Sequence, residues 1–93
     1  MALQTAVHAG LRAEYDPGAD ALYVYFSDSG YSHGRDLDAA RRIDYAADGS
    51  VVGVEVLSPS VGVDLSGLPS ADTIAALLKQ LGLPAAQPVG QRA

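Results

Sequence analysis

One segment, Tyr15–Phe26, constrains the fold of this chain more than any other. It opens with a turn in which Pro17 presets φ, Gly18 permits a positive φ, and the flanking aspartates can accept hydrogen bonds from the N–H groups of the turn. After the turn, aliphatic or phenylalanine side chains alternate with the tyrosines Tyr23 and Tyr25. Because successive side chains of a strand point to opposite faces, the first set is predicted to face a core and the tyrosines the other side of a sheet.

Alternating runs elsewhere extend this strand into a sheet. Besides residues 21–27, strands are predicted over residues 11–15, 34–38, 41–46 and 50–58, and residues 61–65 form either a weak edge strand or part of a loop. Asp48 and Gly49 lie between two of these runs, and this pair is a strong signal for a tight hairpin. The pattern predicts a small antiparallel β-meander of four to five strands.

The C-terminal half contains one amphipathic helix, predicted over residues 70–82. Ser70 is its expected N-cap, and a left-handed glycine at position 82 its expected end. Its apolar residues recur at helical spacing and form one stripe, which is predicted to pack on the sheet. The fold class is therefore α+β, and the expected organisation is a flexible N-terminus that frays or adds a short strand (residues 1–10), one domain (residues 11–83, with the meander over 11–58) and a disordered tail (residues 84–93).

The composition excludes several classes of function. The chain has 93 residues, no cysteine and a net charge of −5. Without cysteine it can hold no disulfide, cysteine zinc site or iron–sulfur cluster, which suits a cytoplasmic protein. No apolar run approaches the roughly 18–20 residues that span a bilayer. The acidic balance disfavours nucleic acid, whose phosphates require a basic patch.

Two motifs of the chain resemble those of a known family. Residues 15–24, from the turn into the alternating strand, and residues 43–57, around the Asp-Gly hairpin, look like the two motifs of the small bacterial and archaeal family called domain of unknown function 2283. The resemblance covers about residues 11–58. It implies a short β-meander followed by a helix, and it brings no assigned activity and no catalytic residues.

The acidic residues allow two readings. Asp16 and Asp20 could act as a carboxylate pair for acid–base chemistry or for a divalent cation, but aspartates in such a turn more often accept hydrogen bonds from the N–H groups of the turn itself. A second candidate is a metal site with mixed oxygen and imidazole ligands, formed by His33, Asp36, Asp38 and Asp44. The expected interpretation of these residues is instead a solvated acidic face of a strand. Because their spacing matches no known metal loop, we predict no metal and no cofactor.

Catalysis has little support in the sequence. His8 and His33 are the side chains that titrate near neutrality, and each lies in a segment flanked by glycine. No Gly-x-Ser-x-Gly elbow accompanies His33, although serines lie close to it at positions 27, 29 and 32. We therefore predict that the protein is not an enzyme.

An interaction surface is the leading functional expectation. A single helix covers only part of such a sheet, so we predict a homodimer or higher assembly, formed by sheet-face packing or helix exchange. The expected interface residues are Tyr23, Tyr25, Val51, Leu57, Ile74 and Leu78. Tyr31 could extend the aromatic surface.

The acidic surface favours a basic protein partner, which would make the chain an antitoxin-like or regulatory interaction module. The alternative is a small-ligand-binding protein or minor enzyme with a pocket between the helix and the loop of residues 31–38, near His33 and Asp36.

Overall fold

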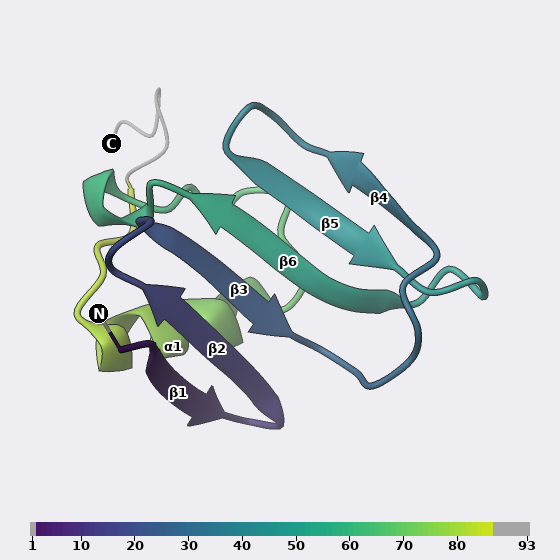
Figure 1. The fold of residues 1–93 in the computed structure, drawn as a ribbon, viewed down its shortest axis with the longest axis horizontal. Helices are drawn as coiled ribbons and strands as arrows, with labels where there is room; N and C mark the ends of the chain where they lie inside the picture. The colour runs from purple at the N-terminus through teal and green to yellow at the C-terminus, as the bar shows by residue number, and fades with distance from the viewer. Residues whose placement is uncertain (1, 87–93) are drawn as a thin grey trace.

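The computed structural model describes residues 2–86 and shows an α+β fold with one antiparallel sheet and one helix (Figure 1). The sheet has six strands: β1 (Gln4–His8), β2 (Leu11–Asp16), β3 (Ala21–Tyr25), β4 (His33–Asp36), β5 (Arg41–Tyr45) and β6 (Val51–Leu57). A 3-10 turn, η1 (Pro59–Val61), and the helix α1 (Ala71–Leu81) follow the last strand. Within residues 2–86 no helix is long and apolar enough to cross a membrane.

The strand order corrects the predicted meander. The order is β1-β2-β3-β6-β5-β4, so β6 lies between β3 and β5 instead of at the end of the sheet. The apolar content of the strands explains this order. Three valines of β6, Val52, Val54 and Val56, are buried, whereas β4 is polar and lies at an edge. A strand that buries its side chains is most stable in the middle of a sheet, and a charged strand protects an edge.

The two ends of the chain also differ from the expectation. Of the two possibilities for residues 1–10, the structure shows the strand, because β1 pairs with β2 along its whole length and brings the sheet to six strands. At the other end, Ala85 forms a parallel bridge with Val63, so residues 84–86 are part of the fold. The rest of the predicted tail, residues 87–93, lies outside the described residues.

The helix packs on β1 and β2, where Ile74, Leu77 and Leu78 are buried against the sheet. Gly82 ends the helix in the left-handed conformation, with φ 71°, as the sequence predicts. Ser70 occupies the N-cap position, but its side chain makes no capping hydrogen bond because its own backbone is left-handed.

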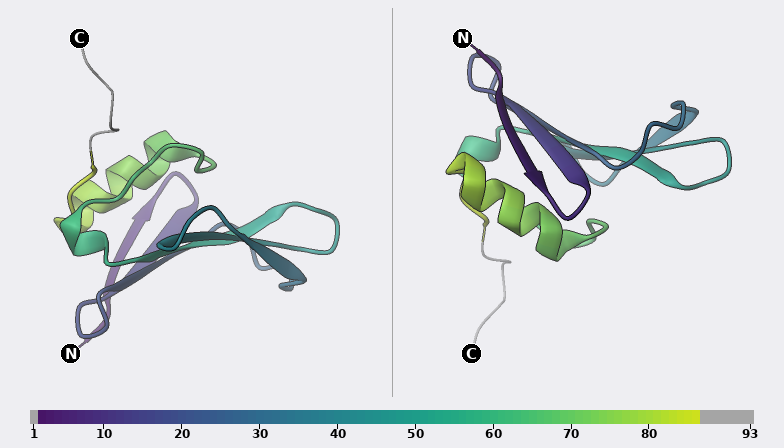
Figure 2. Two further views of the ribbon diagram at one scale, coloured as in Figure 1. Left: turned by 90° about the horizontal axis from the view of Figure 1, so that it is seen from above. Right: turned by 90° about the horizontal axis from the view of Figure 1, so that it is seen from below.

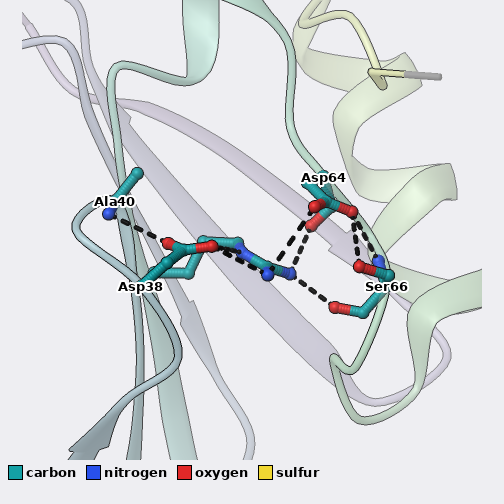
Figure 3. Close-up of polar contacts among 5 residues, drawn as sticks. Asp38, Ala40, Asp64 and Ser66 are labelled. Atoms are coloured by element: carbon teal, nitrogen blue, oxygen red, sulfur yellow. Dashed lines mark hydrogen bonds and ion pairs between the residues drawn. The ribbon is translucent and has the colours of Figure 1, made fainter. Parts of the chain in front are cut away.

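The loop between η1 and α1 adds Val63, Leu65 and Leu68 to the core beside the helix. Residues 61–65 do not form the alternative edge strand, since Val63 makes a single bridge only. Arg41 holds this loop to β5: its guanidinium lies 2.9 Å from Asp38 and donates to the carbonyl oxygens of Asp64 (2.8 Å) and Ser66 (Figure 3). These contacts of Arg41 join the turn after β4 to the loop between η1 and α1.

Helix and loop lie on the same side of the sheet. In both edge-on views of Figure 2 these two layers lie on one face, and nothing else among residues 2–86 covers the other. The buried core therefore lies between α1, the loop and one face of the sheet, and the opposite face is the surface that the fold leaves available.

Candidate functional site

The candidate site is the uncovered side of the sheet, which we call the open face. Strand pairing places its side chains in three rows across the strands, because residues directly opposite each other share a face. The open face carries Arg12, Glu14, Asp16, Tyr23, Tyr25, Asp36, Arg42, Asp44, Glu55 and Leu57. This composition is polar and aromatic, in contrast with the aliphatic core face.

Tyr23 lies across the centre of the open face. Its hydroxyl donates a hydrogen bond of 2.8 Å to Asp44, which is two strands away on β5. The side chain reaches that far because it crosses β6 at Gly53, where any Cβ would collide with the end of the ring. Gly53 does not have the positive φ that favours glycine, so space and not backbone conformation requires a glycine here.

Tyr25 is held in place by a similar set of contacts. Its hydroxyl donates to Glu14 at 3.0 Å, and the guanidinium of Arg12 lies 3.9 Å from the centre of its ring. Arg12 also pairs with Glu14. The rings of Tyr23 and Tyr25 meet edge to face with centroids 4.7 Å apart. The two tyrosines thus form one ordered aromatic unit, held at both hydroxyls by carboxylates.

Arg42 connects this unit to the β4 edge. It pairs with Asp44 at 3.2 Å and with Asp36 at 3.0 Å, and it donates to the hydroxyl of Tyr31 at 3.1 Å. Its guanidinium lies directly over Gly34, where a side chain would displace it. Hydrogen bonds to Tyr31, Asp36 and Asp44 raise the pKa of Arg42 above its usual value, so it stays charged.

The environment keeps both open-face tyrosines neutral. Partial burial is the main cause of the raised pKa of Tyr23, and the hydrogen bond to Asp44 adds to it. Burial and the bond to Glu14 raise the pKa of Tyr25 in the same way. A phenol that donates to a carboxylate resists deprotonation, because a second negative charge would face the first. These tyrosines therefore stay protonated and donate hydrogen bonds to the carboxylates.

Two shallow hollows flank Glu55 on the open face. One has a volume of about 200 Å³ and is lined by residues of β5, β6 and the turn after β4, including Arg42 and Leu57. The other, of about 170 Å³, lies between Tyr23, Glu14 and Asp16, with Leu3 at its border. Among the described residues Glu55 makes no ion pair and no side-chain hydrogen bond. Its carboxylate is thus available to a ligand from either hollow.

The six predicted interface residues do not share one surface in the structure. Tyr23, Tyr25 and Leu57 share the open face, and Leu57 is 46% exposed. Val51 instead pairs with Tyr45 and packs against the core, because an irregularity after Asp44 shifts the register of β5 and β6. Ile74 and Leu78 are fully buried between the helix and its own sheet, so they are not on the surface of this chain.

The two turn aspartates have different roles. Asp16 accepts hydrogen bonds from the N–H groups of Gly18 and Ala19, as predicted for an aspartate that shapes its own turn. Asp20 instead accepts from the hydroxyl of Tyr15 (2.9 Å) and from the hydroxyl of Ser60 (2.6 Å), which is forty residues away. The bond from Ser60 is the main cause of the lowered pKa of Asp20. Asp20 thus links the first hairpin to η1.

The residues of the candidate metal or ligand site do not converge. His33 stacks on Tyr45 on the core side of the sheet, whereas Asp36 lies on the open face with Arg42. Asp38 pairs with Arg41, and Asp44 with Arg42. Among residues 2–86 no three such side chains form a group that could hold a metal ion.

Sequence reasoning missed the residues that organise the open face. No role is predicted from the sequence for Arg42, Gly53 or Glu55. The glycine in the interior of a valine-rich strand was the available signal, because such a glycine often marks a close approach of another group.

A family comparison matches the part of the chain that contains both sequence motifs, residues 15–24 and 43–57. Residues 12–60 match the family model described as protein of unknown function (DUF2283). The chain belongs to this family. No curated protein and no solved structure matches the chain. The family match includes Tyr23, Asp44 and Gly53, and it brings no activity to them.

Proposed function

We propose that this DUF2283 protein is a non-enzymatic interaction module whose open face docks a basic segment of another protein. The observation that carries this proposal is the uncovered sheet face, on which the two tyrosines are already fixed by carboxylates. Tyrosine is enriched in protein interfaces because it offers apolar area together with a polar tip. A side chain that is ordered before binding loses less entropy when the partner arrives.

The charge of the open face supports a basic partner over a second copy of the same face. Its carboxylates, Glu14, Asp16, Asp36, Asp44 and Glu55, outnumber Arg12 and Arg42. Two such faces stacked on each other would bring like charges together, which costs several kcal/mol in an interface. A cationic partner would instead be attracted from a distance, which raises the rate of association. Such binding fits an antitoxin-like or regulatory role, in which the module masks a basic surface.

The small-ligand alternative has no comparable support. It required a pocket that combines His33 with Asp36, and these residues lie on opposite faces of the sheet. The larger hollow contains Asp36 but is shallow and lies on the open face. It therefore fits the edge of a docked protein segment better than an enclosed metabolite.

A pair of charge reversals tests the proposal. Glu55→Lys reverses a charge at the centre of the open face, and Asp72→Lys makes the same change in charge at an exposed position of the helix. Tagged wild type and both variants are incubated with extract of the native host at low and high salt. We expect the wild type and Asp72→Lys to retain the same basic protein at low salt and to release it at high salt.

Glu55→Lys should not retain that protein. Equal retention by both variants, an acidic partner, or binding that salt does not weaken would contradict the proposal. Circular dichroism of each variant shows whether the sheet is intact, so that loss of binding is not confused with unfolding.

A further inference from the structure

The edge strand β1 differs from the other edge of the sheet in ways that concern assembly. An exposed edge offers unpaired N–H and C=O groups, and proteins usually protect it with charges, proline, bulges or a short strand. The opposite edge, β4, carries Arg35 and Asp36. β1 carries no charged residue and no proline, and its register with β2 runs without a shift from Gln4 to His8.

Backbone groups of β1 point away from β2. The carbonyl oxygen of Val7 accepts a hydrogen bond of 3.2 Å from the side chain of Gln80 on the helix, so this group faces the outside of the sheet. Peptide groups of an antiparallel strand alternate in direction, and therefore the N–H groups of Thr5 and Val7 and the carbonyl of Thr5 face outward too. The Val7 carbonyl can accept a second bond, because an oxygen of this kind has two lone pairs.

The edge strand itself is uncharged and partly apolar, and its charged neighbours on β2, Arg12 and Glu14, pair with each other. Val7 is 62% exposed and Leu3, next to the strand, is 54% exposed. On the helix, Gln80, which contacts β1, is uncharged, and Ala76 and Thr73 lie one and two turns before it on the same helical face. In a chain of net charge −5, such an edge is a place where two copies can meet without repulsion.

We propose that β1 pairs with β1 of a second copy of this chain, in antiparallel register about Ala6. This register places Thr5 opposite Val7 of the second copy, and Gln4 opposite its His8. A two-fold axis makes the contact self-complementary and closes it at a dimer. The sheet then continues across the seam as twelve strands, and the helices lie side by side along it. The open face stays free, so this inference does not depend on the proposed function.

Two matched valine substitutions test the seam. Val7→Lys places a charge on the β1 edge, and Val61→Lys makes the same change at the 83% exposed valine of η1. Light scattering after gel filtration gives the mass of each protein. We expect wild type and Val61→Lys to have twice the 9.6 kDa of the chain, and Val7→Lys to have the mass of one chain. Circular dichroism of all three should coincide.

Hydrogen exchange provides a second measurement that needs no variant. In a single chain the amide of Thr5 has no hydrogen-bond partner among residues 2–86, and in the proposed dimer it is hydrogen bonded. Its exchange should therefore slow as the protein concentration rises. A monomeric wild type, a dimer that survives Val7→Lys, a dimer lost in Val61→Lys, or a Thr5 amide whose exchange ignores concentration would each overturn the seam. Glu55→Lys should remain dimeric, which separates this inference from the docking proposal.

Discussion

The close contact between Tyr23 and Gly53 leads to a prediction in which the effect of Gly53→Ala on stability changes sign with the residue at position 23. In the wild-type chain, Gly53→Ala pushes the tyrosine away from Asp44 and from the edge-to-face contact with Tyr25. A hydrogen bond to a charged group contributes about 1.5–3 kcal/mol, and the lower end applies because Tyr23 is partly exposed. The aromatic contact adds about 0.5–1.5 kcal/mol.

Alanine has an opposing effect through the backbone. Glycine in the middle of a strand costs about 0.5–1 kcal/mol relative to alanine, so this amount is recovered on substitution. The expected net loss in the free energy of unfolding is about 1–2.5 kcal/mol, from the hydrogen bond, the aromatic contact and the glycine effect taken together. In a Tyr23→Thr background the ring is absent, and threonine keeps a residue that favours strands. There Gly53→Ala should stabilise the protein by about 0.5–1 kcal/mol.

Urea denaturation followed by circular dichroism measures all four proteins of this cycle. The difference between the two backgrounds gives a coupling energy of about 2–3 kcal/mol, at the upper end of values for residues in contact. The slope of the unfolding free energy against urea should stay constant, because the buried surface hardly changes. If Gly53→Ala destabilises both backgrounds equally, the glycine serves the backbone and not the tyrosine, and our account of the open face fails.

Three further substitutions test the core and the titrating groups. Ile74→Ala should lower the free energy of unfolding by about 3 kcal/mol in urea denaturation, since it leaves a cavity in a fully buried site. Because the pKa of Tyr23 is raised from 10.0, its contribution to the free energy of unfolding is complete below about pH 10 and declines above it. Tyr23→Phe should therefore lose less stability than wild type as the pH rises further, as measured by urea denaturation at several pH values. The lowered pKa of Asp20 has the opposite consequence: its stabilisation is present above about pH 4 and is lost in acid, so Asp20→Asn should differ from wild type at neutral pH and approach it in acid denaturation curves.

The sequence predicts local structure where local chemistry decides it. The turn at Asp16, the alternation of Tyr23 with its neighbours and the helix end at Gly82 follow from the conformations that these residues allow. Strand order does not follow in this way, because the position of β6 between β3 and β5 depends on which strands bury most apolar surface together. β1 was one of the two possibilities left open for residues 1–10, because its five residues show little alternation and are held by pairing with β2 and by packing of the helix.

The open face was predictable in outline only. Alternation places the tyrosines opposite the core, but it cannot show that a hydroxyl reaches an aspartate two strands away. That contact needs β5 and β3 to be separated by one strand with a glycine at the crossing point. The partner of Asp20 was hidden for the same reason, because Ser60 lies forty residues further along the chain.

The two proposed surfaces also have a fixed relation to each other. In an antiparallel pairing the two-fold axis is perpendicular to the sheet, because residues directly opposite each other share a face. A dimer joined at β1 would therefore carry both helices on one side and both open faces on the other. Two acidic faces side by side would bind a basic protein with two suitable segments more tightly than either face alone. Edge pairing and face docking can therefore act together, which packing of two open faces would not allow.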